Sequence, residues 1–136
     1  MRRLPILAAV LMLGACARGP KDRGFGRVGV YQDRITLRKD DGGALTAVDR
    51  RVADLVVYHV TLNGAPIGET LPLSCAWIDP LGHIAHQNSY TTVRVTKQVW
   101  PTHCRCPIGP AAAPGLWKVE MSLDGRLLRS TTFEVK

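Results

Sequence analysis

The chain has 136 residues, a length that suits one domain with a core of moderate size. Its formal net charge is +7, of which Arg2 and Arg3 in the leading segment supply two, so the rest of the chain carries about +5. Lys and Arg are spread along the chain with no run longer than Arg50-Arg51. This distribution argues against a nucleic-acid-binding protein, which would carry a clustered basic surface, and allows only a loose attraction to anionic lipid headgroups.

The leading segment has the three parts of a secretory signal. A short cationic start is followed by an apolar run from Leu4 to Leu13 and by the small residues Gly14 and Ala15. Ten apolar residues are too few for a helix that spans a bilayer, which needs roughly 20. The alternative, a buried core helix, would show polar residues at helical spacing, and this run contains none.

The tetrapeptide Leu13-Gly14-Ala15-Cys16 resembles the lipobox of bacterial lipoproteins. The resemblance implies that the leader, residues 1–15, is cleaved before Cys16. It also implies that Cys16 becomes the first residue of the mature protein and carries acyl chains that hold it on a membrane. Ala17 stands where an aspartate would resemble the signal for retention in the inner membrane. We therefore expect an anchor in the outer membrane, with the protein facing the periplasm.

Residues 16–27 are rich in glycine and charge and poor in side chains that could form a core. This composition predicts a flexible tether between the lipidated cysteine and the folded domain. The functional alternative is that basic residues hold the tether against anionic headgroups; these are Arg18, Lys21, Arg23 and Arg27.

Alternating apolar residues predict strands through most of residues 28–136. One strand within 54–64 places Val56, Tyr58, Val60 and Leu62 on one face, and another places Leu71, Leu73, Cys75 and Trp77 on one face. Within 90–100 we expect Val93 and Val95 to point inward, with a register shift before Trp100. Residues 43–55 show the one stretch after the leader that could form a turn or two of amphipathic helix.

The C-terminal residues 115–136 predict a hairpin around Asp124-Gly125, where glycine can adopt positive φ. A two-residue loop would pair Leu123 with Arg126 and Met121 with Leu128. Residues Phe133 and Val135 would then have the wrong parity for the core. We therefore expect either a bulge between Leu128 and Phe133 or a longer loop.

Six to eight short strands joined by Gly, Pro and Asp turns favour an all-β fold, an antiparallel two-sheet sandwich over residues 28–136. The pattern from Tyr58 to Val135, including Pro114-Gly115-Leu116-Trp117, Asp124-Gly125 and the final Phe133-Glu134-Val135, resembles small immunoglobulin-like modules of the cell envelope. That resemblance implies the fold. It carries over no functional residue, because most members of this loose class have no assigned activity.

Three cysteines, Cys75, Cys104 and Cys106, remain after Cys16 is assigned to the lipid. In an oxidising compartment we expect a disulfide from Cys75 to one of the other two, and we favour Cys104. The leftover thiol, Cys106, could stay free, pair with another chain or exchange with its neighbour. A direct bond between Cys104 and Cys106 would be strained, because only one residue separates them.

A metal site is the sharpest chemical alternative. His83, His86 and the His103-Cys104-Arg105-Cys106 segment could bind copper(I) or zinc if their loops met at one end of the sandwich. The spacing matches no zinc-finger signature, however, and a disulfide would remove the thiolates, so our primary interpretation includes no metal and no other cofactor. We expect His59, in the middle of a strand, to be hydrogen-bonded or to face outward.

Catalytic motifs are missing from the sequence. It contains no Gly-x-Ser-x-Gly elbow, phosphate-binding glycine loop or His-Glu-x-x-His pair, and Cys106 with His103 would lack a third orienting group. We therefore expect no enzyme. The sequence favours a membrane-tethered binding or structural module with an envelope protein as partner, and a periplasmic metal-handling protein is the second hypothesis.

Overall fold

The computed structural model describes residues 23–38 and 43–136. The predicted leader, the lipobox with Cys16 and most of the predicted tether lie outside these residues. The elements are the short 3-10 helix η1 (Phe25–Arg27) and the strands β1 (Gly29–Leu37), β2 (Ala47–Val48), β3 (Leu55–Asn63), β4 (Pro72–Ile78), β5 (Ile84–Thr91), β6 (Trp100–Pro107), β7 (Gly115–Leu123) and β8 (Arg126–Val135). No helix among the described residues is long and apolar enough to cross a membrane.

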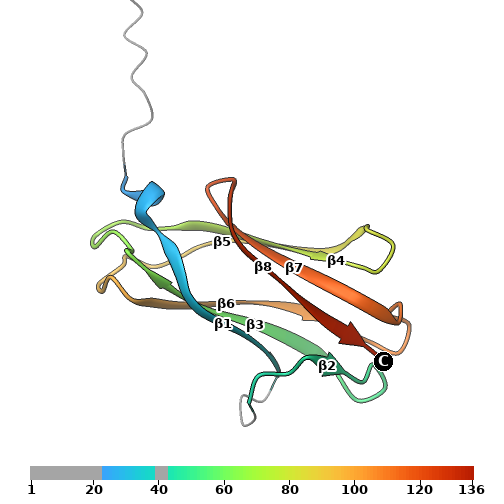
Figure 1. The fold of residues 1–136 in the computed structure, drawn as a ribbon. Coiled ribbons are helices and arrows are strands. Elements are labelled where there is room, and N and C mark those ends of the chain that lie inside the picture. Colours follow the sequence, from blue (N-terminus) through green and yellow to red (C-terminus); the bar gives the residue numbers. More distant parts are fainter. Residues whose placement is uncertain (1–22, 39–42) are drawn as a thin grey trace, which may run out of the picture.

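The strands form two sheets that face each other (Figure 1). One sheet has the order β1-β3-β6 and the other the order β2-β8-β7-β4-β5. All neighbours pair antiparallel except β2 and β8, which pair in parallel over two residues. The fold is therefore the all-β, immunoglobulin-like two-sheet sandwich that the strand pattern predicts, with eight strands.

Period-two alternation determines which side chains form the core. Along β3, β4 and β7 nearly every second residue is buried, because successive side chains of a strand point to opposite faces of its sheet. Each inner face is apolar and packs against the other sheet. The largest fully buried side chains include Trp77, Tyr58, Phe133, Leu62, Leu71, Leu73, Ile108, Met121 and Leu123.

The segment between β5 and β6 differs from the expectation. Residues 92–99 form no strand, and Val93 is 73% exposed whereas Val95 is buried. Backbone hydrogen bonds hold this segment to the β3–β4 loop instead, and two of them involve Val95: its N–H donates to the carbonyl of Glu69, and its carbonyl accepts from the N–H of Gly68. A loop that pairs with another loop does not follow strand alternation, so the prediction that Val93 points inward was wrong.

The predicted C-terminal hairpin is confirmed, with its turn at Asp124-Gly125 and with Leu123 opposite Arg126. The register shift lies at Leu128, because Met121 faces Arg129 and Ser122 faces Leu127. The bulge is thus one step nearer the turn than we expected, and it restores the parity that buries Phe133 and Val135. Residues 43–55 form no helix: residues 47–48 are β2, and one turn, closed by the N–H groups of Val52 and Ala53 on the carbonyl of Asp49, leads into β3.

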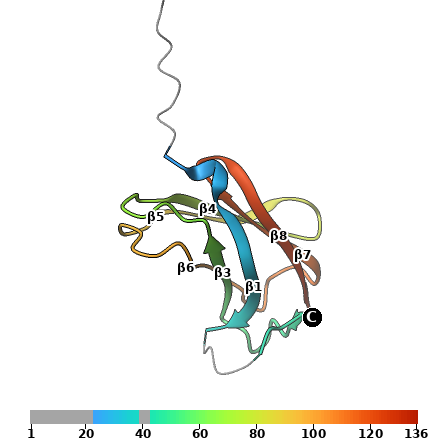
Figure 2. The same cartoon turned by 60° about the vertical axis from the view of Figure 1, so that its left-hand side comes forward.

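Strand direction divides the loops between two ends of the sandwich. We call one the N-terminal end; it comprises η1, the β3–β4 loop (64–71), the β5–β6 loop (92–99) and the β7–β8 turn (124–125). The opposite end holds the β2–β3 loop, the β4–β5 turn and the C-terminus (Figures 1 and 2). The chain enters the described structure at Arg23, on the N-terminal end.

Candidate functional site

A disulfide joins the two sheets. Cys75 on β4 is bonded to Cys104 on β6, with 6.5 Å between their Cα atoms. This is the pairing that we favoured from the sequence. Cys106 is free and buried, and its burial raises the pKa of the thiol to about 12. The leftover thiol is therefore enclosed and protonated at neutral pH.

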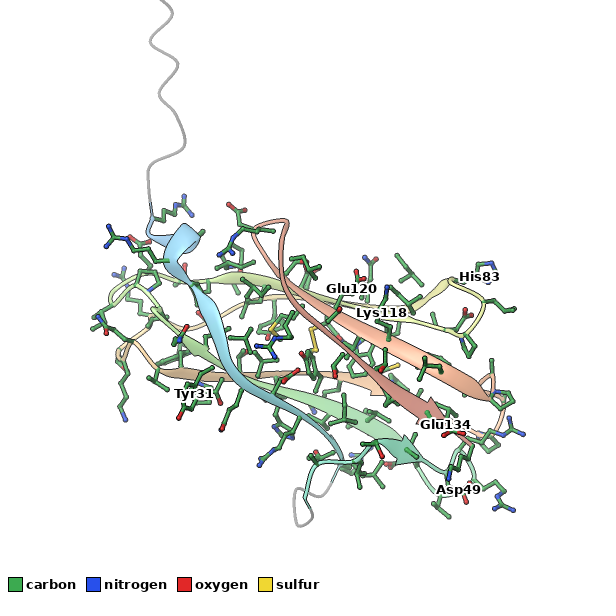
Figure 3. The ribbon with its side chains drawn as sticks, viewed as in Figure 1. Tyr31, Asp49, His83, Lys118, Glu120 and Glu134 are labelled. Carbon is green, nitrogen blue, oxygen red and sulfur yellow. A yellow bond between two sulfur atoms is a disulfide. The ribbon has the colours of Figure 1, made fainter. Side chains whose placement is uncertain are left out.

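The residues proposed for a metal do not form a ligand set. His83 lies at the β4–β5 turn, on the end opposite η1, where its Nδ1 is 3.8 Å from Asp79 Oδ2 (Figure 3). Cys104 is bonded to Cys75 and has no thiolate to offer a metal, and the thiol of Cys106 is buried. Within the described residues no group of three or more His, Cys, Asp or Glu side chains is arranged to hold a metal ion.

The other two histidines of the proposed metal site, His86 and His103, line one groove. This groove lies between β5 and β6, the outermost strands of the two sheets on one side of the sandwich (Figure 2), and has a volume of about 700 Å³. The Tyr90 hydroxyl and Thr102 Oγ1 are 2.6 Å apart and connect the two strands across it. The groove is lined by His86, Gln87, Asn88, Ser89, Tyr90, Thr92, Val93, Trp100, Pro101, Thr102, His103, Cys104 and Arg105.

His59 lies on the neighbouring strand β3 and has a structural environment. It is paired with His103, with 6.1 Å between the ring centroids, and its Nε2 is 2.9 Å from Oγ1 of the buried Thr36. The expectation of a hydrogen-bonded histidine is confirmed for His59.

The inward side of β5 is polar. Its inward residues His86, Asn88 and Tyr90 pair with Trp77, Cys75 and Leu73 of β4 and are only partly buried. Asn88 Oδ1 accepts a hydrogen bond from the indole N–H of Trp77 at 2.8 Å. Burial raises the pKa of Tyr90. Water and polar side chains therefore reach the space behind β5, and this side of the sandwich is open.

The hydrogen bonds between β4 and β5 show which backbone groups of β5 face its free edge. On β4, the carbonyl of Pro72 accepts from Asp124 on the β7 side, whereas the carbonyl of Leu71 accepts from Thr92 on the β5 side. Backbone groups alternate in direction along a strand, so the β5 residues opposite Leu73, Cys75 and Trp77 use their N–H and C=O groups toward β4. The alternate residues direct theirs to the open edge; these are Gln87, Ser89 and Thr91.

Of the four sheet edges in the described structure, the edge of β5 alone lacks the usual protection against added strands. β6 carries Pro101, Pro107 and the charged Arg105. β2 has only two residues, and the part of β8 that β2 leaves unpaired carries Arg126 and Arg129. β1 contains a bulge after Val30 and two adjacent charges, Asp33 and Arg34. β5 is eight residues long and has neither a proline nor an Asp, Glu, Lys or Arg. Long uncharged edges of this kind pair readily with another strand.

Sequence reasoning did not find this edge or its groove. We expected no strand over residues 84–91, and the available signal is that the run from Ile84 to Thr91 contains no formal charge and no proline. Recognising its importance requires the strand order, because only strands at the ends of a sheet have a free edge.

Comparisons with known proteins place the chain by its fold. No family model matches it, and no curated protein matches it in sequence. Among solved structures, an immunoglobulin-like protein from Pseudomonas aeruginosa is similar over 80% of this chain and 96% of that protein, with a TM-score of 0.57 and 16% identity. An alkylpurine DNA glycosylase from Pseudomonas fluorescens, bound to DNA containing an abasic-site analog, is similar over 80% of this chain, with a TM-score of 0.55 and 17% identity. This chain spans 30% of that glycosylase.

Proposed function

We propose that this protein is a lipid-anchored module of the bacterial cell envelope that works by binding a partner protein rather than by catalysis. The observation that carries the proposal is the unprotected edge of β5, with the groove between β5 and β6 beside it. An extended segment of the partner would add to β5 as a further strand, and its side chains would enter the groove.

Strand addition suits the groups that β5 exposes. Gln87, Ser89 and Thr91 offer backbone donors and acceptors in a row, and main-chain hydrogen bonds supply affinity in this mode of recognition. Alternate side chains of the added strand would point toward the groove, where Trp100 and Val93 provide apolar surface and His86, His103 and Arg105 provide polar contacts. The lining contains no Asp or Glu, which favours an acidic or neutral segment.

The membrane location rests on other features. The Leu13-Gly14-Ala15-Cys16 motif supports an anchor on the acyl chains of Cys16, and Ala17 supports delivery to the outer membrane, facing the periplasm. A buried disulfide between the two sheets supports an oxidising compartment, since such bonds are rare in the cytosol.

The test is photo-crosslinking in cells, with a photoreactive amino acid at Gln87 on the edge of β5. A second chain carries it at Thr132, an exposed position on β8. We expect one dominant crosslinked envelope protein from position 87 and none from position 132.

A proline variant identifies the binding mode. Ser89→Pro removes an N–H that points to the open edge and takes no part in the β4 ladder, so the fold should tolerate it. Ser89→Ala keeps the N–H and serves as the matched control. We expect Ser89→Pro to reduce the crosslink at least tenfold and Ser89→Ala to leave it unchanged. Equal crosslinking by both variants would rule out strand addition at β5.

A further inference from the structure

We infer that the N-terminal end of the sandwich is a membrane-contacting surface that rests on an anionic lipid bilayer. This inference rests on the proposed lipid anchor at Cys16. It adds that the folded domain has its own contact with the bilayer, which fixes how the domain stands on the membrane.

Contacts between its loops make the N-terminal end one continuous surface. The Arg126 guanidinium, next to the β7–β8 turn, donates hydrogen bonds to the carbonyls of Phe25 and Val28 around η1. The N–H of Ala65 donates to Gln98 at 3.0 Å and so joins the β3–β4 and β5–β6 loops. Arg94 donates to the carbonyl of Gly68 at 3.5 Å between the same two loops.

This end carries an excess of positive charge. Among the described residues, and with Arg23 before η1 and Arg126 after the β7–β8 turn included, five cations face two acids; the cations are Arg23, Arg27, Arg94, Lys97 and Arg126, and the acids are Glu69 and Asp124. All seven residues are exposed. At the opposite end, opposite charges lie beside each other, as in the pairs Arg38–Asp54 and Arg51–Asp49, each 3.0 Å apart. Unneutralised Lys and Arg near a surface are what an anionic bilayer attracts.

Apolar side chains project among these cations. Ile67 is 63% exposed on the β3–β4 loop, and Val99 on the β5–β6 loop is 52% exposed. Basic residues together with exposed aliphatic side chains are typical of surfaces that sit at the boundary between headgroups and acyl chains. A charged partner protein would explain the cations but would not need the aliphatic side chains to be this exposed in the free domain.

The proposed anchor lies close to this end along the chain. Arg23 lies seven positions after Cys16, and seven steps along the chain cannot span more than roughly 25 Å. The N-terminal end is therefore held near the bilayer, where weak attractions act at high effective concentration. The strands extend away from the end that holds η1 (Figure 1). With this end on the membrane, most of the edge of β5 would therefore stay clear of the bilayer.

The experiment uses the full lipidated protein, extracted from membranes and reconstituted into vesicles. A fluorescent amino acid replaces Ile67 at the N-terminal end or, as the matched control, Leu81, which is 78% exposed at the opposite end. Brominated lipids quench a fluorophore at the bilayer surface. We expect at least twofold stronger quenching at position 67 than at 81 in vesicles of phosphatidylethanolamine and phosphatidylglycerol, and a smaller difference in phosphatidylcholine or in 1 M salt.

Charge reversal tests the role of the cations. Lys97→Glu and Arg94→Glu/Lys97→Glu should each weaken quenching at position 67, whereas Arg51→Glu/Lys136→Glu at the opposite end should leave it unchanged. Lys97→Glu keeps the Arg94 contact with the β3–β4 loop and so answers the question even if the double variant fails to fold.

The outcomes separate this inference from the proposed function. Equal quenching at both positions in a protein whose Cys16 is shown to be acylated by mass spectrometry would overturn the membrane-contacting surface and leave the anchored binding module standing. A Cys16 without acyl chains would overturn the anchor and this inference together, while the crosslink from position 87 would still report on binding at β5.

Discussion

On the side opposite the groove, Asp33 of β1 contacts a tyrosine of its own sheet and an arginine of the other sheet. Tyr58 on β3 donates to Asp33 Oδ2 on β1 at 2.7 Å, and Arg129 of β8 lies 3.5 Å from the other oxygen of Asp33. Desolvation and the hydrogen bond to Asp33 raise the pKa of Tyr58. A buried hydroxyl with a charged acceptor stabilises the fold only while both groups are present.

Tyr58→Phe should therefore destabilise the protein. We expect a loss of about 1.5 kcal/mol in the free energy of unfolding, at the low end for hydrogen bonds to charged groups because Arg129 still neutralises Asp33. Urea denaturation measures the change. Tyr31→Phe, at a tyrosine that is 65% exposed (Figure 3), is the control and should change the midpoint very little. An unchanged midpoint for Tyr58→Phe would mean that the hydroxyl does not contribute.

Cys106 should be unreactive while the protein is folded. The thiolate is the nucleophile, and burial holds the pKa of this thiol near 12, so very little thiolate exists at pH 9 and the sulfur is also enclosed. We expect iodoacetamide to leave the Cys106 peptide unmodified in buffer and to alkylate it fully in guanidinium chloride, as read by mass spectrometry. Rapid alkylation of the folded protein would show that β6 opens locally.

At the scale of elements, the turns depend on a few residues with positive φ. Asp124 and Gly125 have φ of 49° and 83° in the two-residue β7–β8 turn, which matches the twist of the strands that it joins. Gly64, with φ of 66°, lies where the β3–β4 loop passes η1, and a Cβ there would approach the carbonyl oxygen of Arg27 to 2.5 Å. A side chain at Gly125 would be disfavoured only by the backbone conformation. A side chain at Gly64 would be disfavoured by the backbone conformation and by the contact with Arg27.

Alanine substitutions at three glycines should separate these effects. Gly109→Ala meets no neighbouring atom and needs no positive φ, so it should change stability by less than about 0.5 kcal/mol. Gly125→Ala should cost about 1 kcal/mol for its left-handed backbone. Gly64→Ala should cost more than about 2 kcal/mol, because Arg27 must also move. Thermal or urea unfolding of the three variants measures the loss of stability at each position. An equal loss at all three would contradict the proposed roles of positive φ and of the contact with Arg27.

At the scale of the whole molecule, the disulfide cross-links two sheets that pack against each other through their side chains. Cys75 and Cys104 are 29 residues apart, and closing a loop of that length stabilises a fold by about 3 to 4 kcal/mol on the chain-entropy estimate. The bond also ties the edge strand β6 to β4, next to β5.

The double variant Cys75→Ala/Cys104→Ala should therefore unfold at lower urea concentration, with a loss of about 3 to 4 kcal/mol from the missing cross-link and a further contribution from the smaller core side chains. Reduction of the unaltered protein by dithiothreitol isolates the first effect. If reduction leaves the unfolding midpoint unchanged, the cross-link does not stabilise the sandwich.

Local patterns in the sequence predict the sandwich, the inward faces of β3, β4 and β7, the hairpin at Asp124-Gly125 and the Cys75–Cys104 bond. The sandwich, the inward faces and the hairpin depend on alternation or on turn chemistry within a short stretch. The disulfide was expected from the number of cysteines and the oxidising compartment. The position of the bulge at Leu128 and the exposure of Val93 were not predictable, because a hairpin register and a loop-to-loop contact decide them. The candidate site was missed for a related reason: β5 and β6, which form the groove, follow each other in the chain but belong to different sheets, and no local pattern shows that both are edge strands on the same side of the sandwich.

The antiparallel ladder of β1 with β3 has a mechanical consequence. If the acyl anchor is fixed in the bilayer and a partner holds β5, tension enters the domain at the start of β1 and acts along that strand. The eight paired positions of β1 and β3 then share the stress in shear and do not separate one after another. The sulfur–sulfur bond prevents the two layers from sliding apart. The module is thus suited to transmit a pull between membrane and partner without unravelling.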